Sequence, residues 1–229
     1  MRSVSIIGAG LIKFGEHWNQ SFRKMAVQAS INAIENAKLQ GNEIQEIYTG
    51  CMASGRFIGQ EHIGALIADQ LGLNPIPSTR LEAACASGGV ALRQAYLSIA
   101  SGDQNIALVV GAEKMTEVSG GQAGTALGGA GDQETELFHG ATFPALYALM
   151  AKKHMQEFGT TEEQLACVAV KNHKNAMHNE YAQFHKEFTV KEVMESGYVS
   201  TPLKLLDCSP LTDGAAAVIL AETSLAKKC

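Results

Sequence analysis

The chain from Val4 to Gly111 alternates short apolar runs with segments that have the spacing of amphipathic helices. Apolar, largely β-branched runs predict four strands, at Val4–Ile7, Ile44–Met52, Ser78–Leu81 and Ile106–Gly111. Apolar residues at three- and four-residue steps predict three helices, at Ser21–Lys38, Gln60–Leu71 and Val90–Ser101. Such alternation is typical of a largely parallel sheet with helices on both faces.

The pattern changes after the fourth predicted strand. Residues 117–140 are rich in Gly, Ala, Thr and Gln, and they are followed by two predicted helices, Phe143–Phe158 and Glu162–Met177. Residues 178–205 mix aromatic and charged side chains, and Ala215–Ala221 predicts a last strand. We therefore expect a core domain from 1–116, an inserted domain from 117–205, and a return strand of the core within 206–229. An insertion of this length is usually functional.

Composition excludes several classes of function. The net charge is −5, so no basic footprint predicts a nucleic-acid or anionic-membrane partner. No apolar run approaches the ~20 residues that span a bilayer, and the short Val4–Ile7 run does not fit a secretory leader. Five scattered cysteines without a Cys-x-x-Cys pair predict neither a disulfide framework nor structural zinc, and we expect a cytoplasmic protein. His173 and His178 lie five residues apart, which does not favour a metal site.

Gly8-Ala9-Gly10 follows a predicted strand and raises the alternative of dinucleotide binding. The third glycine of that fingerprint would fall at Lys13, and the second predicted strand ends without an acidic residue. The pattern therefore does not favour NAD.

Cys85 lies between the third predicted strand and the third predicted helix, within the run of small residues 83–89. A helix N-terminus presents unpaired N–H groups and partial positive charge, which favour the reactive thiolate. Small neighbours allow a tight turn and the approach of a substrate. The residues alone leave two readings open, a nucleophile at a strand-to-helix turn and a buried structural cysteine.

Several stretches together resemble the thiolase superfamily. They are Glu82–Gly89, Leu97–Gly102, Val109–Met115 and Leu206–Val218. Two more, Phe57–His62 and Phe138–Pro144, are closer to the archaeal and sterol-carrier-protein-type thiolases. The resemblance runs nearly end to end.

The resemblance implies a thiolase-like N-terminal core domain, with a five-stranded mixed sheet, helices on both faces and an inserted loop domain on the coenzyme A side. It implies acyl transfer between coenzyme A thioesters, as in an acetyl-CoA C-acetyltransferase, with Cys85 as the acyl-accepting nucleophile. Coenzyme A and acyl-CoA would be substrates, and no cofactor would be bound permanently.

The resemblance also implies groups that this sequence lacks. A thiolase has a Gly-His-Pro histidine that activates the nucleophile and a later Cys-x-Gly cysteine that transfers protons. Neither motif occurs in the 229 residues, and Cys229 is the last residue. We therefore expect the N-terminal half of a thiolase, inactive or nearly so by itself.

Four further residues are candidates for binding. His139 would line the acyl pocket, or it would only shape its loop. The resemblance places Lys171, His173 and Lys174 near the nucleotide part of coenzyme A, where basic side chains suit phosphates, while the alternative is a solvated helix face.

Two hypotheses follow from the sequence. The first is the nucleophile-bearing half of a thiolase, with a homodimer or higher oligomer, a separate C-terminal thiolase half and HMG-CoA synthase as partners in isoprenoid and lipid metabolism. The second is a non-catalytic acyl-CoA-binding or scaffolding module derived from a thiolase.

Overall fold

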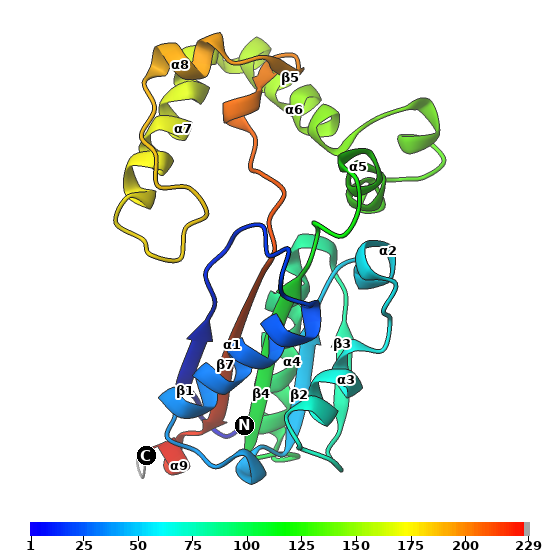
Figure 1. The fold of residues 1–229 in the computed structure, drawn as a ribbon, viewed down its shortest axis with the longest axis vertical. Helices are drawn as coiled ribbons and strands as arrows, with labels where there is room; N and C mark the ends of the chain where they lie inside the picture. The colour runs from blue at the N-terminus through cyan, green and yellow to red at the C-terminus, as the bar shows by residue number, and fades with distance from the viewer. Residues whose placement is uncertain (227–229) are drawn as a thin grey trace. The chain divides into compact units, whose positions relative to one another are not determined.

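The computed structural model describes residues 1–226, so Cys229 lies outside the described residues. The chain divides into two compact units (Figure 1). The core unit contains Met1–Val118 and the chain from Thr212 onward, and the inserted unit contains Ser119–Leu211.

The core unit is built on one five-stranded sheet. Its strands are β1 (Val4–Leu11), β2 (Glu46–Gly50), β3 (Ser78–Leu81), β4 (Ile106–Glu113) and β7 (Gly214–Glu222). They are ordered β1-β7-β4-β2-β3. This confirms the five-stranded mixed sheet that the resemblance implied.

Strand β7 is the reversed strand in the largely parallel sheet that the alternation predicted. β2 is parallel to β3 and β4, whereas β7 is antiparallel to both β1 and β4. The last residue of β4, Glu113, pairs with the first of β7, Gly214. The chain leaves the sheet and re-enters it at the same edge, so β7 has to run back along β4.

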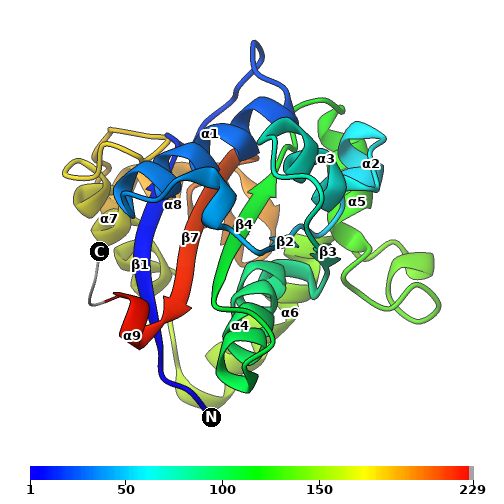
Figure 2. The same ribbon diagram turned by 90° about the horizontal axis from the view of Figure 1, so that it is seen from below.

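Helices cover both faces of the sheet (Figure 2). The helices α1 (Phe22–Asn36) and α3 (Ile63–Gln70) pack on the face that carries Leu108 and Ile219. Helix α4 (Ser87–Ser101) packs on the other face, against Val109 and Leu220. Because neighbouring residues of a strand point to opposite faces, central strands buried on both sides have continuous apolar runs. The short helices α2 (Ser54–Ile58) and α9 (Thr223–Ala226) complete the described core unit.

Glycines let α1 lie directly on β1. A β-carbon at Gly10 would lie 2.2 Å from the carbonyl oxygen of Ala29, and one at Gly8 would lie 2.5 Å from that of Ala33. Gly8-Ala9-Gly10 therefore has a packing function. Helix α1 begins where the sequence indicates, because the Ser21 hydroxyl accepts a hydrogen bond from the backbone N–H of Lys24 at 3.2 Å.

The inserted unit is mainly helical. It contains α5 (Gly120–Gly128), α6 (Phe143–Phe158), α7 (Glu162–Ala176), α8 (Val190–Glu195) and the hairpin of β5 (Tyr198–Ser200) with β6 (Leu203–Lys204). Helices α5, α7 and α8 each start with a capping box, in which a Ser or Thr and a Gln or Glu three residues later bond each other's backbone. The sequence predicted α6 and α7 and missed α5, α8 and the hairpin.

The boundaries of the units differ from the predicted 116/117 and 205/206. They fall at 118/119 and 211/212. The second boundary lies later because the 3-10 turn Leu205–Asp207 packs against α7 and α8. Within residues 1–226, no helix is both long enough and apolar enough to cross a bilayer.

Candidate active site

The parallel strands β2, β3 and β4 end at one edge of the core sheet, and Cys85 follows β3 at this edge. It lies in the 3-10 turn Ala84–Ala86, which continues into the first turn of α4. The side chain of Cys85 is exposed. β-carbons at Gly88 or Gly89 would meet no atom within 4 Å, so the first turn of α4 is open on that side.

Gly50, in β2, packs against this turn, a role that was not predicted from the sequence. A β-carbon at Gly50 would lie 2.6 Å from the backbone nitrogen of Gly88 and from the carbonyl carbon of Ser87. The end of β2 therefore touches the first turn of α4 through backbone alone. A glycine at the end of a predicted strand is a signal for such a close approach.

A second thiol at the same edge has a contrasting environment. Cys51 follows β2, is 2% exposed, and its Sγ donates to a carboxylate oxygen of Glu113 at 3.2 Å. Burial, together with the negative charge of Glu113, raises the pKa of the Cys51 thiol to about 12. Cys51 therefore stays a protonated thiol near neutral pH. Of the two cysteines at this edge, Cys85 is the accessible one.

A buried ion pair joins the strand ends where the chain leaves and re-enters the core unit. Lys114 and Asp213 are 1% and 0% exposed, and the Lys114 Nζ lies 3.0 Å from Asp213 Oδ2. Asp213 also accepts hydrogen bonds from the Thr116 hydroxyl and from the backbone N–H groups of His17, Met115 and Thr116. Burial by itself would raise the pKa of Asp213, but these hydrogen bonds and Lys114 outweigh it and lower the pKa.

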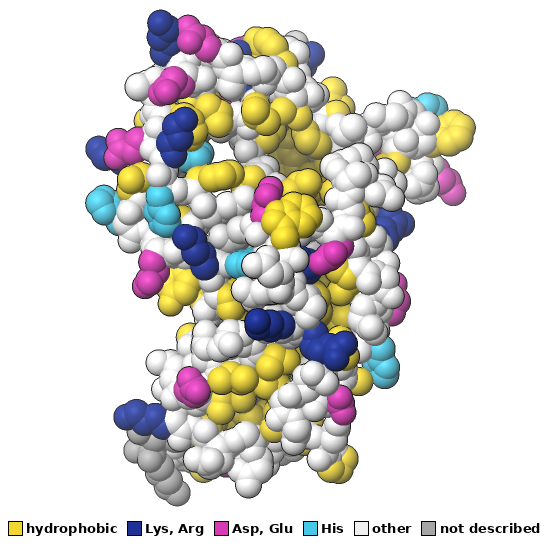
Figure 3. Space-filling model, in the orientation of Figure 1, with side chains coloured by type: hydrophobic (Ala, Val, Ile, Leu, Met, Phe, Trp, Pro, Cys, Tyr) yellow, Lys and Arg dark blue, Asp and Glu magenta, His cyan; other side chains and the backbone are white. Residues whose placement is uncertain are grey.

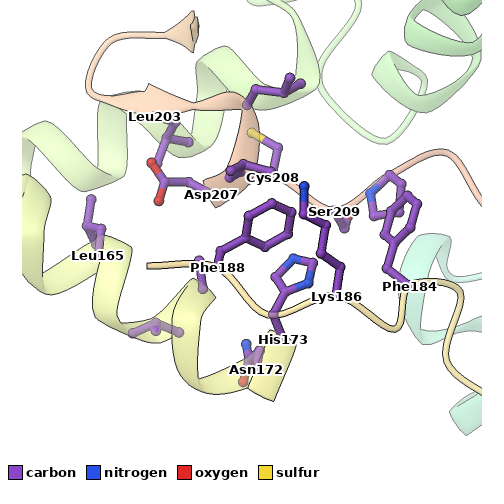
Figure 4. A pocket seen from close by; sticks show the side chains of 15 residues that line it. Leu165, Asn172, His173, Phe184, Lys186, Phe188, Leu203, Asp207, Cys208 and Ser209 are labelled. Carbon is purple, nitrogen blue, oxygen red and sulfur yellow. The ribbon is translucent and has the colours of Figure 1, made fainter. Parts of the chain in front are cut away.

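The inserted unit contains a pocket of about 730 Å³ (Figure 4). It lies between α7, the segment before α8, and the segment after β6. The His173 ring meets Phe188 edge-on at 4.7 Å between centroids and is stacked with Phe184 at 6.4 Å. The Lys186 Nζ lies 4.7 Å from the centre of the Phe188 ring.

The pocket combines apolar walls with few polar groups. His173 Nδ1 is buried and has no hydrogen-bond partner among the described residues. The lining is Leu165, Val168, Ala169, Asn172, His173, Phe184, Lys186, Phe188, Leu203, Leu205, Leu206, Asp207, Cys208, Ser209 and Pro210. Apolar and aromatic walls with a small number of polar groups are typical of small-molecule sites.

The predicted binding residues fall in different places. His173 lines the pocket, whereas Lys171 and Lys174 are exposed on α7 and are absent from its lining. The lining residues of α7 recur at three- and four-residue steps, and Lys171 and Lys174 fall on another part of the helix surface. His139 is exposed in the 3-10 turn Leu137–His139, where its ring meets Phe138 edge-on.

Two aromatic residues and a lysine of the pocket were missed. Phe184, Lys186 and Phe188 occupy alternate positions in the segment between α7 and α8, which has no regular secondary structure. Their two-residue period was a usable signal, because alternate residues of an extended chain point to the same side. Among residues 1–226, no group of three or more His, Cys, Asp or Glu side chains is placed to hold a metal ion.

Comparison with known proteins agrees with this architecture. The chain is 53% identical over 228 residues to proteins called acetyl-CoA acetyltransferase from Methanocaldococcus jannaschii and Methanothermobacter thermautotrophicus. All of this chain is covered, but it spans 58% and 59% of those relatives. A solved acetyl-CoA acetyltransferase from Syntrophomonas wolfei has the same fold, with a TM-score of 0.79 at 16% identity, covering 100% of this chain and 67% of that one.

The sequence profile described as "Thiolase, N-terminal domain" matches residues 4–224, which is nearly the whole chain. This match, the mixed sheet with its long insertion, and the relatives lead to one conclusion: the chain belongs to the thiolase family, as an N-terminal domain.

Proposed function

We propose that this chain is the nucleophile-bearing part of a thiolase-type acyltransferase, which moves acyl groups between coenzyme A thioesters through an acyl-enzyme on Cys85. One observation carries the proposal. Cys85 is an exposed thiol in the turn that opens α4, at the carboxyl edge of the parallel strands, where open α/β sheets place their ligand sites. The 53% identity to two acetyl-CoA acetyltransferases supports acetyl-CoA as the acyl donor.

The reaction has two steps. The Cys85 thiolate attacks the thioester carbonyl carbon of acyl-CoA, the carbon–sulfur bond to coenzyme A breaks, and coenzyme A leaves as a thiolate that takes up a proton. In the second step a base supplied from outside these residues takes a proton from the α-carbon of acetyl-CoA, and the carbanion attacks the acyl carbonyl carbon. The thioester bond to Cys85 then breaks, Cys85 leaves as a thiolate, and the lengthened acyl-CoA is released. In the reverse direction, free coenzyme A takes the acyl group from Cys85.

The pocket of the inserted unit is proposed to hold the nucleotide part of coenzyme A. Phe184 and Phe188 offer ring surfaces for the adenine, and Lys186 and His173 offer donors for phosphate oxygens. His173 Nδ1 is buried without a hydrogen-bond partner in residues 1–226, so it is a group that a bound ligand would satisfy. Roles for Lys171 and Lys174 at phosphates, and for His139 at the acyl group, stay predictions.

The other catalytic groups are proposed to come from outside these residues. No Gly-His-Pro occurs in the 229 residues, so the histidine that would activate Cys85 is not among them. Loss of one member of a cooperating catalytic group commonly lowers turnover about a thousandfold or more. The 229-residue chain assayed alone is therefore expected to be nearly inactive in acetoacetyl-CoA thiolysis.

The acyl-enzyme is tested by incubating the chain with acetyl-CoA and mapping acetyl groups by peptide mass spectrometry. Acetylation of Cys85, absent in Cys85→Ala and retained in Cys167→Ala, supports the proposal. Binding of coenzyme A without any acetyl group on Cys85 would instead support the second function, a non-catalytic acyl-CoA-binding module that uses the pocket of the inserted unit.

The resemblance also supports wider proposals about the assembled enzyme. They are a homodimer or higher oligomer, a C-terminal thiolase half in a separate chain, a cytoplasmic location, and delivery of acetoacetyl-CoA to HMG-CoA synthase for isoprenoid synthesis. Co-purification with a chain carrying Gly-His-Pro and Cys-x-Gly, and restored thiolysis in that complex, would support the split enzyme. Turnover at ordinary rates by the 229 residues alone would contradict it.

A further inference from the structure

The backbone immediately before Cys85 adopts a conformation that alanine rarely takes. Ala84 has a φ of +48°, in the left-handed region that favours glycine. Lys38 is the other non-glycine residue with positive φ within residues 1–226, and it follows the end of α1, where that conformation is common. Ala84 has no such helix end before it. A left-handed alanine persists only when its surroundings hold it.

Two side chains hold Ala84. The Ser87 hydroxyl accepts a hydrogen bond from the backbone N–H of Ala83 at 2.9 Å and donates one to the carbonyl oxygen of Ala84 at 2.6 Å. The Glu82 carboxylate accepts a hydrogen bond from the backbone N–H of Ala84 at 2.5 Å. Ser87 is 4% exposed, so its two bonds are shielded from water. Together these bonds fix the peptide groups on both sides of Ala84.

The second of those peptide groups joins Ala84 to Cys85. Its orientation constrains the direction in which the Cα–Cβ bond of Cys85, which carries the sulfur, leaves the backbone. The backbone N–H of Ser87 also donates to the Ala84 carbonyl, so that oxygen receives two bonds from the first residue of α4. The position of the sulfur is thereby tied to the start of the helix.

We propose that Ser87, assisted by Glu82, is a positioning residue for Cys85, holding Ala84 in its left-handed conformation so that the sulfur stays presented at the first turn of α4. This rests on the proposed function, in which Cys85 is the nucleophile. Ser87 acts through the backbone and needs no contact with the substrate.

The test uses iodoacetamide at neutral pH on the 229-residue chain, with the alkylation rates of Cys85 and Cys167 read from the same sample. Cys167 is exposed in the inserted unit and serves as an internal reference. In Ser87→Ala, Ala84 relaxes out of the left-handed region, and we expect the Cys85 to Cys167 rate ratio to fall about tenfold. An unchanged or higher ratio overturns the proposal.

Rescue separates positioning from a merely structural effect of Ser87. Adding Ala84→Gly to Ser87→Ala should bring the ratio back to within about threefold of the original chain, because glycine adopts positive φ without steric cost. A structural defect caused by the lost buried hydroxyl would not respond to Ala84→Gly. Absence of any rescue overturns the proposal.

A matched control and a second variant complete the test. Ser98→Ala removes another buried hydroxyl of α4, one that donates to Glu46, and should leave the ratio unchanged. If Ser87→Ala does not fold, Glu82→Ala takes its place, because Glu82 is exposed. About a threefold fall in the Cys85 to Cys167 rate ratio is then expected, and no fall overturns the proposal.

Alkylation reports only how the sulfur is presented. If Cys85 is alkylated selectively but is not acetylated by acetyl-CoA, the proposed acyl-transfer function is contradicted, while the proposal that Ser87 positions the sulfur still holds.

Discussion

The core unit and the inserted unit bury their helices to very different degrees. Helix α1, with 15 residues, buries six side chains, whereas α6, with 16 residues, buries only Ala148. Tyr147, Leu149, Met150 and Phe158 of α6 are all exposed. Hydrophobic side chains are visible on the surface of the inserted unit over α6 (Figure 3). The core unit is therefore stabilised by a buried interior, whereas α6 of the inserted unit leaves most of its apolar side chains exposed.

The ion pairs of the two units also differ in burial. Both side chains of the Lys114–Asp213 pair are buried in the core unit, whereas the inserted unit has the partly exposed Lys204–Glu162 pair and the exposed Lys191–Glu195 pair, whose side chains are 81% and 65% exposed. A buried charge that loses its partner is strongly destabilising, whereas an exposed pair contributes little. Substitutions in the two units should therefore differ most where charge or volume is buried.

Removing the buried carboxylate should have the largest effect. Asp213→Ala leaves the Lys114 ammonium buried with the half-exposed Glu117 as its remaining acidic partner, and it removes the acceptor for three backbone N–H groups. We expect a loss of about 3–5 kcal/mol in the free energy of unfolding, measured by urea denaturation. The control Glu195→Ala, in the exposed pair, should cost less than about 0.5 kcal/mol. Equal losses of unfolding free energy in the two variants would contradict the claimed difference between a buried and an exposed ion pair.

Filling the contact between β1 and α1 should have the next largest effect. A β-carbon at Gly10 would overlap the backbone of α1, so Gly10→Ala should lower the free energy of unfolding by about 1–3 kcal/mol. Gly124→Ala is the matched substitution in α5, where nothing lies within 4 Å, and it should stabilise the chain by about 0.5–1 kcal/mol. Thermal unfolding of both variants checks the opposite signs, and destabilisation by Gly124→Ala would contradict the account.

Lowering the pH should destabilise the inserted unit before the core unit. The hydrogen bond from Lys204 lowers the pKa of Glu162 in the inserted unit below 4.5, so its contribution is complete above that pH and is lost as the pH falls through the folded value. The pKa of Asp213 is lowered from 3.8, so the loss of its contribution begins only below that pH, whereas the loss for Glu162 begins below 4.5. Hydrogen exchange, corrected for the pH dependence of its intrinsic rate, should show the inserted unit losing protection first on acidification. The opposite order would contradict this prediction.

The smallest of these effects concerns binding in the inserted unit. Lys186→Ala should weaken coenzyme A binding about tenfold in calorimetry, because it removes the pocket's ammonium group. The control Lys152→Ala, exposed on α6, should change the dissociation constant less than about twofold. If Lys174→Ala weakens coenzyme A binding as much as Lys186→Ala does, the result would favour the predicted phosphate-binding role of Lys174 over binding in the pocket.

Most of the core unit could be predicted because burial against the sheet produces a recognisable spacing of apolar residues within each helix and strand. The spacing along α1 and the apolar run of β4 both reflect burial against the sheet. The place of β7 was not predictable from its own residues. A continuous apolar run indicates a central strand but does not say which neighbours it pairs with.

The inserted unit was less predictable because little of it is buried. Helix α5 is rich in glycine and has weak periodicity, so its capping box, Ser119 with Gln122, was the available signal. The turn at Cys85 was predicted from small residues beside a thiol. The left-handed Ala84 was not, because glycine is the usual mark of that conformation and this position is alanine.

The central claim is that Cys85 takes an acyl group from coenzyme A. The most direct measurement is peptide-resolved alkylation by iodoacetamide after removal of unbound ligand, following an incubation with acetyl-CoA long enough to allow for the roughly thousandfold slower reaction expected without the activating histidine. The account predicts that Cys85 stays protected, that hydroxylamine, which cleaves thioesters, restores its labelling, and that Cys167 labels at the same rate throughout. Full labelling of Cys85 once the ligand is removed would contradict the claim.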